Sequence, residues 1–146
     1  MGKIIAVANQ KGGVGKTTTS INLAASLAAH KQKILLIDLD PQGNATMGSG
    51  VDKNTLVQTC NDVLLHDCSA AQACLTTAGG YDLIPANGDL TVAEINLIER
   101  EHRETFLFKA LQPIKNNYDL ILIDCPPALN TLTINALVAA HSVLIP

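Results

Sequence analysis

Short apolar runs alternate with longer segments of mixed polarity along the chain. Five runs are rich in Ile, Leu and Val and have the length of a strand. They cover residues 3–8, 33–38, 81–85, 120–123 and 142–145. The intervening segments predict helices over residues 17–30, 61–66, 69–76, 90–100, 104–114 and 129–140. Residues 39–58 carry Pro41 and several Gly and Asn residues early on, which predicts mostly loop.

The predicted strands are continuously apolar rather than alternating. Strands of that kind are buried on both faces, as in a parallel sheet with a layer of helices on each side. Because helices separate the strands, the connections are right-handed crossovers. The sequence therefore predicts an α/β fold, a doubly wound and mostly parallel sheet with helices on both faces.

The last apolar run is followed only by Pro146 and by no covering helix. A central parallel strand needs cover on both of its faces. We therefore expect residues 1–146 to be the N-terminal portion of a single domain whose remainder lies beyond them. The alternative is a small complete domain that ends on an edge strand.

Composition argues against several function classes. Hydrophobic residues make up 47% and charged residues 16%, which suits a packed core and not a disordered chain. The formal net charge is -3, and only two basic residues are Arg, which argues against a strongly basic nucleic-acid domain. No apolar run reaches the roughly 18 residues of a membrane span. The four cysteines form no Cys-x-x-Cys pair, which is typical of a reduced, cytoplasmic chain.

The strongest chemical signal is the sequence QKGGVGKTT at residues 10–18, between a predicted strand and a predicted helix. Glycines let the backbone curl so that its N–H groups point inward, and a helix N-terminus favours an anion. Lys16 is placed to reach the β- and γ-phosphates of a nucleotide, and the Thr17 hydroxyl is placed to bind Mg²⁺. The match to G-x-x-x-x-G-K-[ST] is incomplete, because Gln10 replaces the first glycine and Lys11 adds a second cation. A Gly-rich turn that merely caps a helix is the plainer alternative. The predicted nucleotide-binding residues are Lys11, Gly12, Gly13, Val14, Gly15, Lys16, Thr17 and Thr18.

Two further predicted strands end in acidic residues. Asp38 and Asp40 follow the second strand, and Asp124 follows the fourth. Ligands of open α/β sheets bind at the carboxyl ends of strands, where the phosphate loop also begins. Four hydrophobic residues before Asp124 form a Walker B pattern, so we expect Asp124 to hold Mg²⁺ through a water molecule, because Mg²⁺ keeps much of its hydration. The alternatives are a turn at Asp40 and a helix cap at Asp124.

The sequence KGGVGKT at residues 11–17 resembles the deviant Walker A motif of the ParA/MinD ATPases. In that family the extra lysine, here Lys11, reaches across an ATP-dependent homodimer to the partner's ATP. The resemblance implies that Lys11, Lys16 and Asp40 are catalytic, with Asp40 acting on the attacking water. It places Asp38 near the metal shell or the switch, and it implies ATP and Mg²⁺ as cofactors.

Residues 38–46 (DLDPQGNAT), 83–94, 123–127 (IDCPP) and 132–137 (LTINAL) resemble the partitioning branch of the family, ParA/Soj. That branch implies a cytoplasmic, nucleoid-associated protein that positions chromosome or plasmid DNA. A ParB-type centromere-binding protein would stimulate its ATP hydrolysis. Non-specific double-stranded DNA would bind through the part of the family chain that continues past residue 146, and no membrane would be involved.

Other members of the family leave alternatives. A MinD-type positioning ATPase would cycle on the membrane through a C-terminal amphipathic helix. An iron–sulfur carrier would need cysteines arranged to bridge a dimer, and the four cysteines show no such arrangement. A non-catalytic nucleotide sensor would not need Lys11, Lys16, Asp40 and Asp124 together. Residues 1–146 alone are also expected to bind nucleotide weakly if the missing remainder completes the site.

Overall fold

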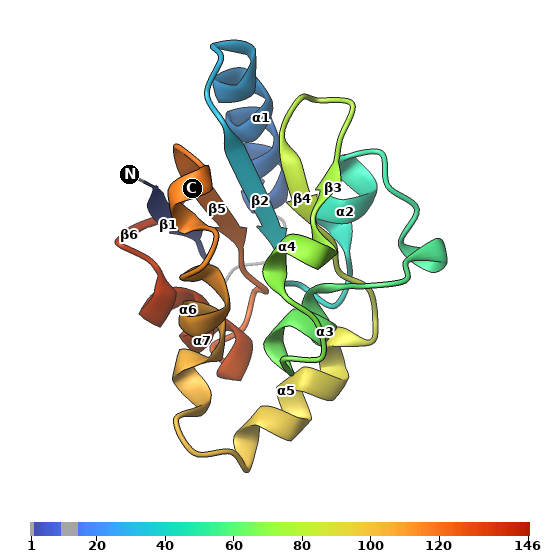
Figure 1. Cartoon of the computed structure of the whole chain (residues 1–146), viewed down its shortest axis with the longest axis vertical. Helices are drawn as coiled ribbons and strands as arrows, with labels where there is room; N and C mark the ends of the chain where they lie inside the picture. Colours follow the sequence, from blue (N-terminus) through green and yellow to red (C-terminus); the bar gives the residue numbers. More distant parts are fainter. Residues whose placement is uncertain (1, 10–14) are drawn as a thin grey trace.

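A single mixed sheet forms the centre of the computed structural model, which describes residues 2–9 and 15–146. Its strands are β1 (Lys3–Val7), β2 (Ile34–Asp38), β3 (Leu75–Thr76), β4 (Asp82–Ile84), β5 (Leu120–Asp124) and β6 (Ser142–Leu144). The strand order is β3-β4-β2-β5-β1-β6, and only β3 is antiparallel to its neighbour among these described strands. Strands β2 and β5 are buried at every position, as expected for the centre of a parallel sheet (Figure 1).

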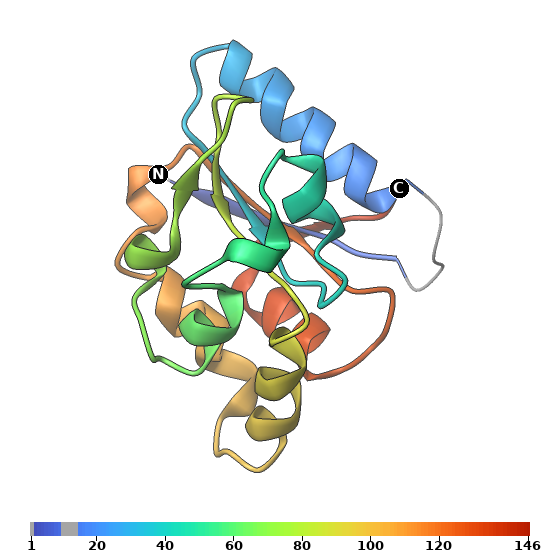
Figure 2. The ribbon, with the colours of Figure 1, turned by 90° about the vertical axis from the view of Figure 1, so that its right-hand side faces the viewer.

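Helices cover both faces of the sheet. They are α1 (Lys16–Ala29), α2 (Asn44–Gly48), α3 (Cys60–Leu64), α4 (Ala70–Ala73), α5 (Leu90–Ile98), α6 (Phe106–Leu111) and α7 (Thr131–Ala139), with short 3-10 turns at Lys53–Thr55, Arg103–Thr105 and Lys115–Asn117. Helices α1 and α2 lie on one face, whereas α3, α5, α6 and α7 lie on the other (Figure 2). Each face has its own buried hydrophobic cluster, so the predicted doubly wound architecture is confirmed.

The register of the central strands brings two aspartates side by side. Asp124 of β5 is aligned with Asp38 of β2, and on its other side with Val7 of β1. Leu36 and Leu122, two positions earlier in the same strands, pack in the cluster that faces α1. Because strand side chains alternate between faces, Asp38 and Asp124 also lie on the α1 face, at the carboxyl edge of the sheet.

The segment 69–76, expected to be one helix, is a helix only over α4 and then becomes strand β3. A capping box between Ser69 and Gln72 starts the helix, but Cys74 has an extended backbone that ends it. The chain then turns at Gly80, whose φ of 87° is a left-handed conformation that suits glycine. The result is an antiparallel edge strand that the apolar pattern did not predict.

Residues 39–58 are mostly loop, as expected, but they also contain α2 and the turn Lys53–Thr55. Helix α2 begins after Gly43, which has a φ of 67°. The turn is capped by the side chain of Asp52, which accepts a hydrogen bond from the backbone N–H of Asn54. Both elements are too short to give a helical period in the sequence.

The helix predicted over residues 104–114 is α6 preceded by a 3-10 turn, and it ends before Pro113, which cannot continue a helix. The last predicted helix, over residues 129–140, is α7. It begins at Thr131 because the side chain of Asn130 accepts hydrogen bonds from the N–H groups of Leu132 and Thr133. Among the described residues, no helix combines the length and apolar character needed to cross a membrane.

Candidate nucleotide-binding site

The N-terminus of α1 points toward the carboxyl edge of the sheet. Its N-cap residue is Gly15, which has a φ of 77° and provides no side-chain cap. The first N–H groups of a helix have no partner within the helix, so this end is suited to an anion. Lys16 and Thr17 are the first two helical residues, and Thr18 is exposed beside them. The remaining predicted loop residues, Lys11, Gly12, Gly13 and Val14, lie outside the described residues.

Three side chains of α1 converge on the carboxylate of Asp124. Lys16 Nζ lies 3.0 Å from Oδ1 in an ion pair whose side chains are 8% and 0% exposed. The Thr17 hydroxyl donates a hydrogen bond to Oδ2 at 2.9 Å. The Ser20 hydroxyl lies 3.0 Å from Oδ1. The structure thus brings together Lys16, Thr17 and Asp124, which the sequence had predicted to share a site.

Sequence reasoning missed Ser20. It lies four positions after Lys16 and three after Thr17, so all three face the same side of α1. That spacing was the available signal, but a serine at such a position is also common on an ordinary helix. Its hydroxyl also lies 3.1 Å from the carbonyl oxygen of Lys16, which holds it against the first turn of the helix.

Asp38 has a different set of partners. Its Oδ2 accepts hydrogen bonds from the backbone N–H and the hydroxyl of Thr46, at 2.8 and 2.7 Å. Its Oδ1 accepts a hydrogen bond from the backbone N–H of Asp40 at 3.1 Å. Burial, with a smaller effect of the nearby Asp124 charge, raises the pKa of Asp38 from 3.8 to about 7 against the opposing effect of these donors. The two oxygens of Asp38 are therefore engaged by Thr46 and Asp40.

Asp40 lies two residues after the end of β2, and its relative exposure is 5%. Its Oδ1 accepts a hydrogen bond from the backbone N–H of Gln42 at 3.0 Å. Within the described part of the chain, no donor is bonded to Oδ2. One oxygen of Asp40 thus has no hydrogen-bond partner among the described residues, as a group that acts on water requires.

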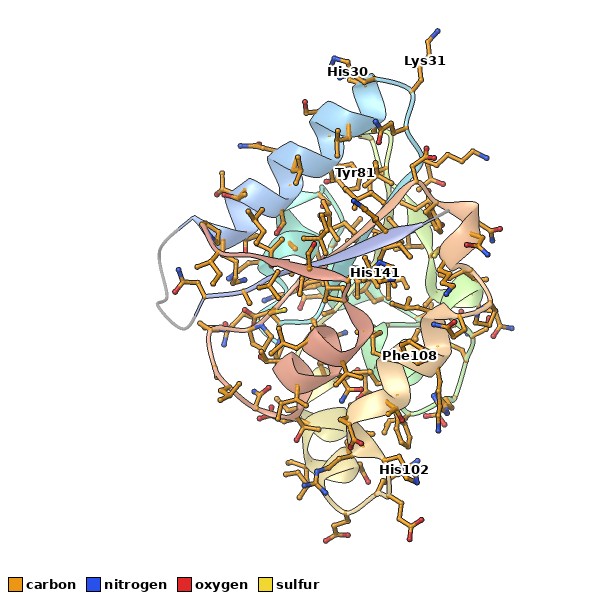
Figure 3. All side chains as sticks on the ribbon, turned by 90° about the vertical axis from the view of Figure 1, so that its left-hand side faces the viewer. His30, Lys31, Tyr81, His102, Phe108 and His141 are labelled. Atoms are coloured by element: carbon orange, nitrogen blue, oxygen red, sulfur yellow. The ribbon has the colours of Figure 1, made fainter. Side chains whose placement is uncertain are left out.

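Cys125 and the histidines are outside this chemistry. Burial raises the pKa of the Cys125 thiol to about 12, so it is a core residue and not a nucleophile. Among the exposed histidines, His30, His102 and His141 lie far apart on the molecule (Figure 3). In residues 2–9 and 15–146, no group of His, Cys, Asp and Glu could hold a metal by itself, so a metal here would depend on the Thr17 hydroxyl and on a nucleotide.

The family model described as "AAA domain" matches residues 2–146. The chain belongs to this family. The AAA domain is 62% identical to a Pseudomonas putida protein of undescribed function, 53% identical to the sporulation initiation inhibitor protein Soj of Bacillus subtilis, and 50% identical to the chromosome partitioning protein ParA of Myxococcus xanthus. All of this chain is covered in each comparison, and it spans 56%, 58% and 52% of those relatives' lengths. The resemblance to ParA and Soj inferred from the motifs is therefore confirmed.

Solved structures agree with the sequence comparison. The crystal structure of cobyrinic acid a,c-diamide synthase from Mycobacterium smegmatis with bound ADP and magnesium superposes on the AAA domain with a TM-score of 0.98 and 45% identity. The match covers 100% of this chain and 60% of that one. The same enzyme with a bound ATP analogue and magnesium also gives a TM-score of 0.98. The fold is thus that of the P-loop NTPases.

We expect Lys16→Ala to destabilise the folded AAA domain. The substitution leaves the Asp124 charge buried without its cationic partner, which typically costs about 3 kcal/mol. Lys109→Ala, at an exposed position of α6, is the control and should change stability by less than about 0.5 kcal/mol. Urea denaturation at pH 7.5 measures both. Equal unfolding free energies for the two variants would contradict the expected contribution of the ion pair to stability.

The raised pKa of Asp38 predicts a pH-dependent contribution to stability. Because the folded state holds this proton more tightly than the unfolded state, the contribution is fully present below about pH 4 and is lost as the pH rises to about 7. The unfolding free energy of the wild type, relative to Asp38→Asn, should therefore fall across this range and be level above it. Urea denaturation of both proteins at a series of pH values tests this, and a difference that does not vary with pH would refute it.

Proposed function

We propose that this AAA domain binds ATP with Mg²⁺ and is the N-terminal, nucleotide-binding portion of a ParA-type ATPase domain that hydrolyses ATP to ADP and phosphate. The observation that carries the proposal is the convergence of Lys16, Thr17 and Asp124 at the N-terminus of α1. The relatives, which extend beyond the length of this chain, support the assignment of residues 1–146 to a larger domain.

The proposed phosphate site includes Gly15 and the first turn of α1. Without nucleotide, Lys16 is held by Asp124 in a buried ion pair. A bound ATP offers Lys16 a second anion, so its ammonium group exchanges Asp124 for the β- and γ-phosphate oxygens. We assign Lys11, Gly12, Gly13 and Val14, which lie outside the described residues, to the same phosphate loop as Gly15, Lys16, Thr17 and Thr18.

The residues present fit Mg²⁺. Thr17 donates its hydroxyl proton to Asp124, which leaves lone pairs of Oγ1 for a hard cation. Asp124 can then hold a metal-bound water molecule, and phosphate oxygens would complete an all-oxygen set of ligands. When bound, Mg²⁺ neutralises charge on the phosphates. Asp38 is a weaker candidate for the metal shell, because its carboxylate is bonded to Thr46 and to the backbone of Asp40, whereas that of Asp124 is bonded to Lys16 and Thr17 at the phosphate end of α1.

Asp40 is assigned to the attacking water. Phosphoryl transfer depends mainly on positioning and charge neutralisation, so the protein must hold water in line with the γ-phosphate. Oδ2 of Asp40, which has no hydrogen-bond partner in residues 2–9 and 15–146, orients that water. It accepts a proton from the water as the bond from water oxygen to phosphorus forms and the bond to the ADP oxygen breaks. Lys16, and Lys11 from the partner of a homodimer, neutralise the charge that develops.

The biological role proposed is segregation of chromosome or plasmid DNA, with the ATP-bound homodimer as the active state. The names of the relatives Soj and ParA support this role. A ParB-type centromere-binding protein would stimulate hydrolysis, and non-specific double-stranded DNA would bind through segments outside these 146 residues. The formal charge of -3 agrees with placing DNA contacts elsewhere. The protein would then be cytoplasmic and associated with the nucleoid.

We expect Lys16→Ala to abolish binding of ATP, because it removes the cation of the phosphate site, whereas Asp40→Ala should bind ATP and fail to hydrolyse it. Binding is measured with a fluorescent ATP analogue and Mg²⁺, hydrolysis by phosphate release from the full-length protein, and folding by circular dichroism. A folded wild type that binds no ATP would overturn the proposed function. Wild-type turnover by Asp40→Ala would overturn the role of Asp40 alone.

Lys11→Ala is expected to spare ATP binding by the monomer and to weaken the ATP-dependent homodimer, because this lysine is assigned to the partner's ATP. Light scattering of the full-length protein with a non-hydrolysable ATP analogue measures the dimer. Lys3→Ala, at an exposed position of β1, serves as the control for loss of a positive charge. An ATP dimer unchanged by Lys11→Ala would contradict the assignment.

A further inference from the structure

Thr46 joins three separate segments around the proposed water site. It lies in α2, its backbone N–H and hydroxyl both donate to Asp38 at the end of β2, and its Oγ1 accepts a hydrogen bond from the backbone N–H of Ala86 at 2.9 Å. Ala86 follows β4, on the other side of β2 from β5. Thr46, Asp38 and Ala86 are each 0% exposed.

Asp38 links Thr46 to Asp40 by hydrogen bonds. Its Oδ2 is engaged by Thr46, while its Oδ1 accepts the hydrogen bond from the backbone N–H of Asp40. A continuous series of buried hydrogen bonds therefore runs from Ala86 through Thr46 and Asp38 to the backbone of Asp40. Since both hydrogen-bond donors of Thr46 are used, no water is needed to complete the series.

The turn that follows Asp40 is fixed from the opposite side. The N–H of Gly43 donates to the carbonyl oxygen of Asp40 at 2.9 Å, and Lys53 Nζ donates to the carbonyl oxygen of Gln42 at 2.7 Å. Gly43 has a φ of 67°, and a Cβ atom there would lie 2.8 Å from the carbonyl oxygen of Ala86. The backbone around Asp40 is thus held closely, and the N–H of Gln42 also holds Oδ1 of its side chain.

We propose that Thr46 is a positioning residue for hydrolysis, which acts through Asp38 to fix the backbone from which Asp40 addresses the attacking water. This inference rests on the proposed function and makes Asp38 a structural link to Asp40 and not a metal ligand. Its physical basis is geometric, since a displacement of about 1 Å at a catalytic group can cost on the order of 100-fold in rate. Thr46 itself touches neither nucleotide nor water.

The test compares Thr46→Val with Thr46→Ser in the full-length protein. Valine keeps the branched shape but removes the hydroxyl, whereas serine keeps the hydroxyl. We expect Thr46→Val to lower kcat by about 100-fold with unchanged affinity for ATP, and Thr46→Ser to retain most of the wild-type kcat. Thr77→Val is the matched control, because Thr77 is also buried and donates its hydroxyl proton to a carbonyl oxygen, that of Tyr81, in the β3–β4 turn. It should leave kcat unchanged.

A second substitution guards against a variant that does not fold. Asp38→Asn replaces one acceptor oxygen by a donor, so it cannot accept from both Thr46 and Asp40. It should lower kcat as Thr46→Val does. In an Asp40→Asn background, Thr46→Val should cause no further loss, because the residue through which it acts has already been removed.

Several results would overturn the inference. One is a wild-type kcat for folded Thr46→Val or Asp38→Asn, and another is an equal loss of kcat in Thr46→Val and Thr46→Ser. A third is a loss of ATP affinity that parallels the loss of kcat. The last is a loss of kcat on adding Thr46→Val to Asp40→Asn that is as large as in the wild-type background. Failure of the proposed function gives a different result, because the wild-type protein itself would then not hydrolyse ATP.

Discussion

The buried ion pair between Lys16 and Asp124 is the contact on which the candidate site depends. Removing both charges from water is costly, and their attraction offsets this only when hydrogen bonds satisfy the remaining oxygens. Thr17 and Ser20 provide those bonds from the same face of α1. The pair therefore fixes the start of α1 against the end of β5. It also keeps the lysine beside the helix N-terminus, where an anion is favoured.

The parallel register explains why this pair meets the rest of the proposed chemistry. Central strands that end at the same edge bring residues far apart in the sequence into one row, so Asp38 and Asp124 become neighbours. The two faces of the sheet have separate hydrophobic clusters, which hold the strands in that register. A slip of one residue in either strand would turn the aspartate of that strand toward the α5–α7 face and away from α1.

Much of this arrangement was predictable from the sequence. Continuous apolar runs predicted β1, β2, β4, β5 and β6, and acidic residues after such runs predicted the site edge. Strand β3 and helix α2 were not predicted, because β3 has only two residues and α2 only five, too few to show a period in the sequence. Ser20 and Thr46 were missed for a different reason. The Ser20 hydroxyl contacts Asp124 and the Thr46 hydroxyl contacts Asp38, and spacing along the chain does not reveal either partner.

The neighbouring aspartates Asp38 and Asp124 differ in the groups that surround them, and these groups determine the role that we assign to each. Asp124 is paired with a cation, and its oxygens face the end of α1, where phosphate and metal would bind. Asp38, its register partner, meets only neutral donors in the described part of the chain, and burial raises its pKa to about 7. Its three donors among the described residues belong to Thr46 and Asp40, so this carboxyl group is tied to α2 and to the chain after β2 and not to α1. We therefore assign binding to the aspartate of β5 and support to that of β2, because α1 brings an ammonium group to Asp124, whereas α2 brings a hydroxyl and a backbone N–H to Asp38.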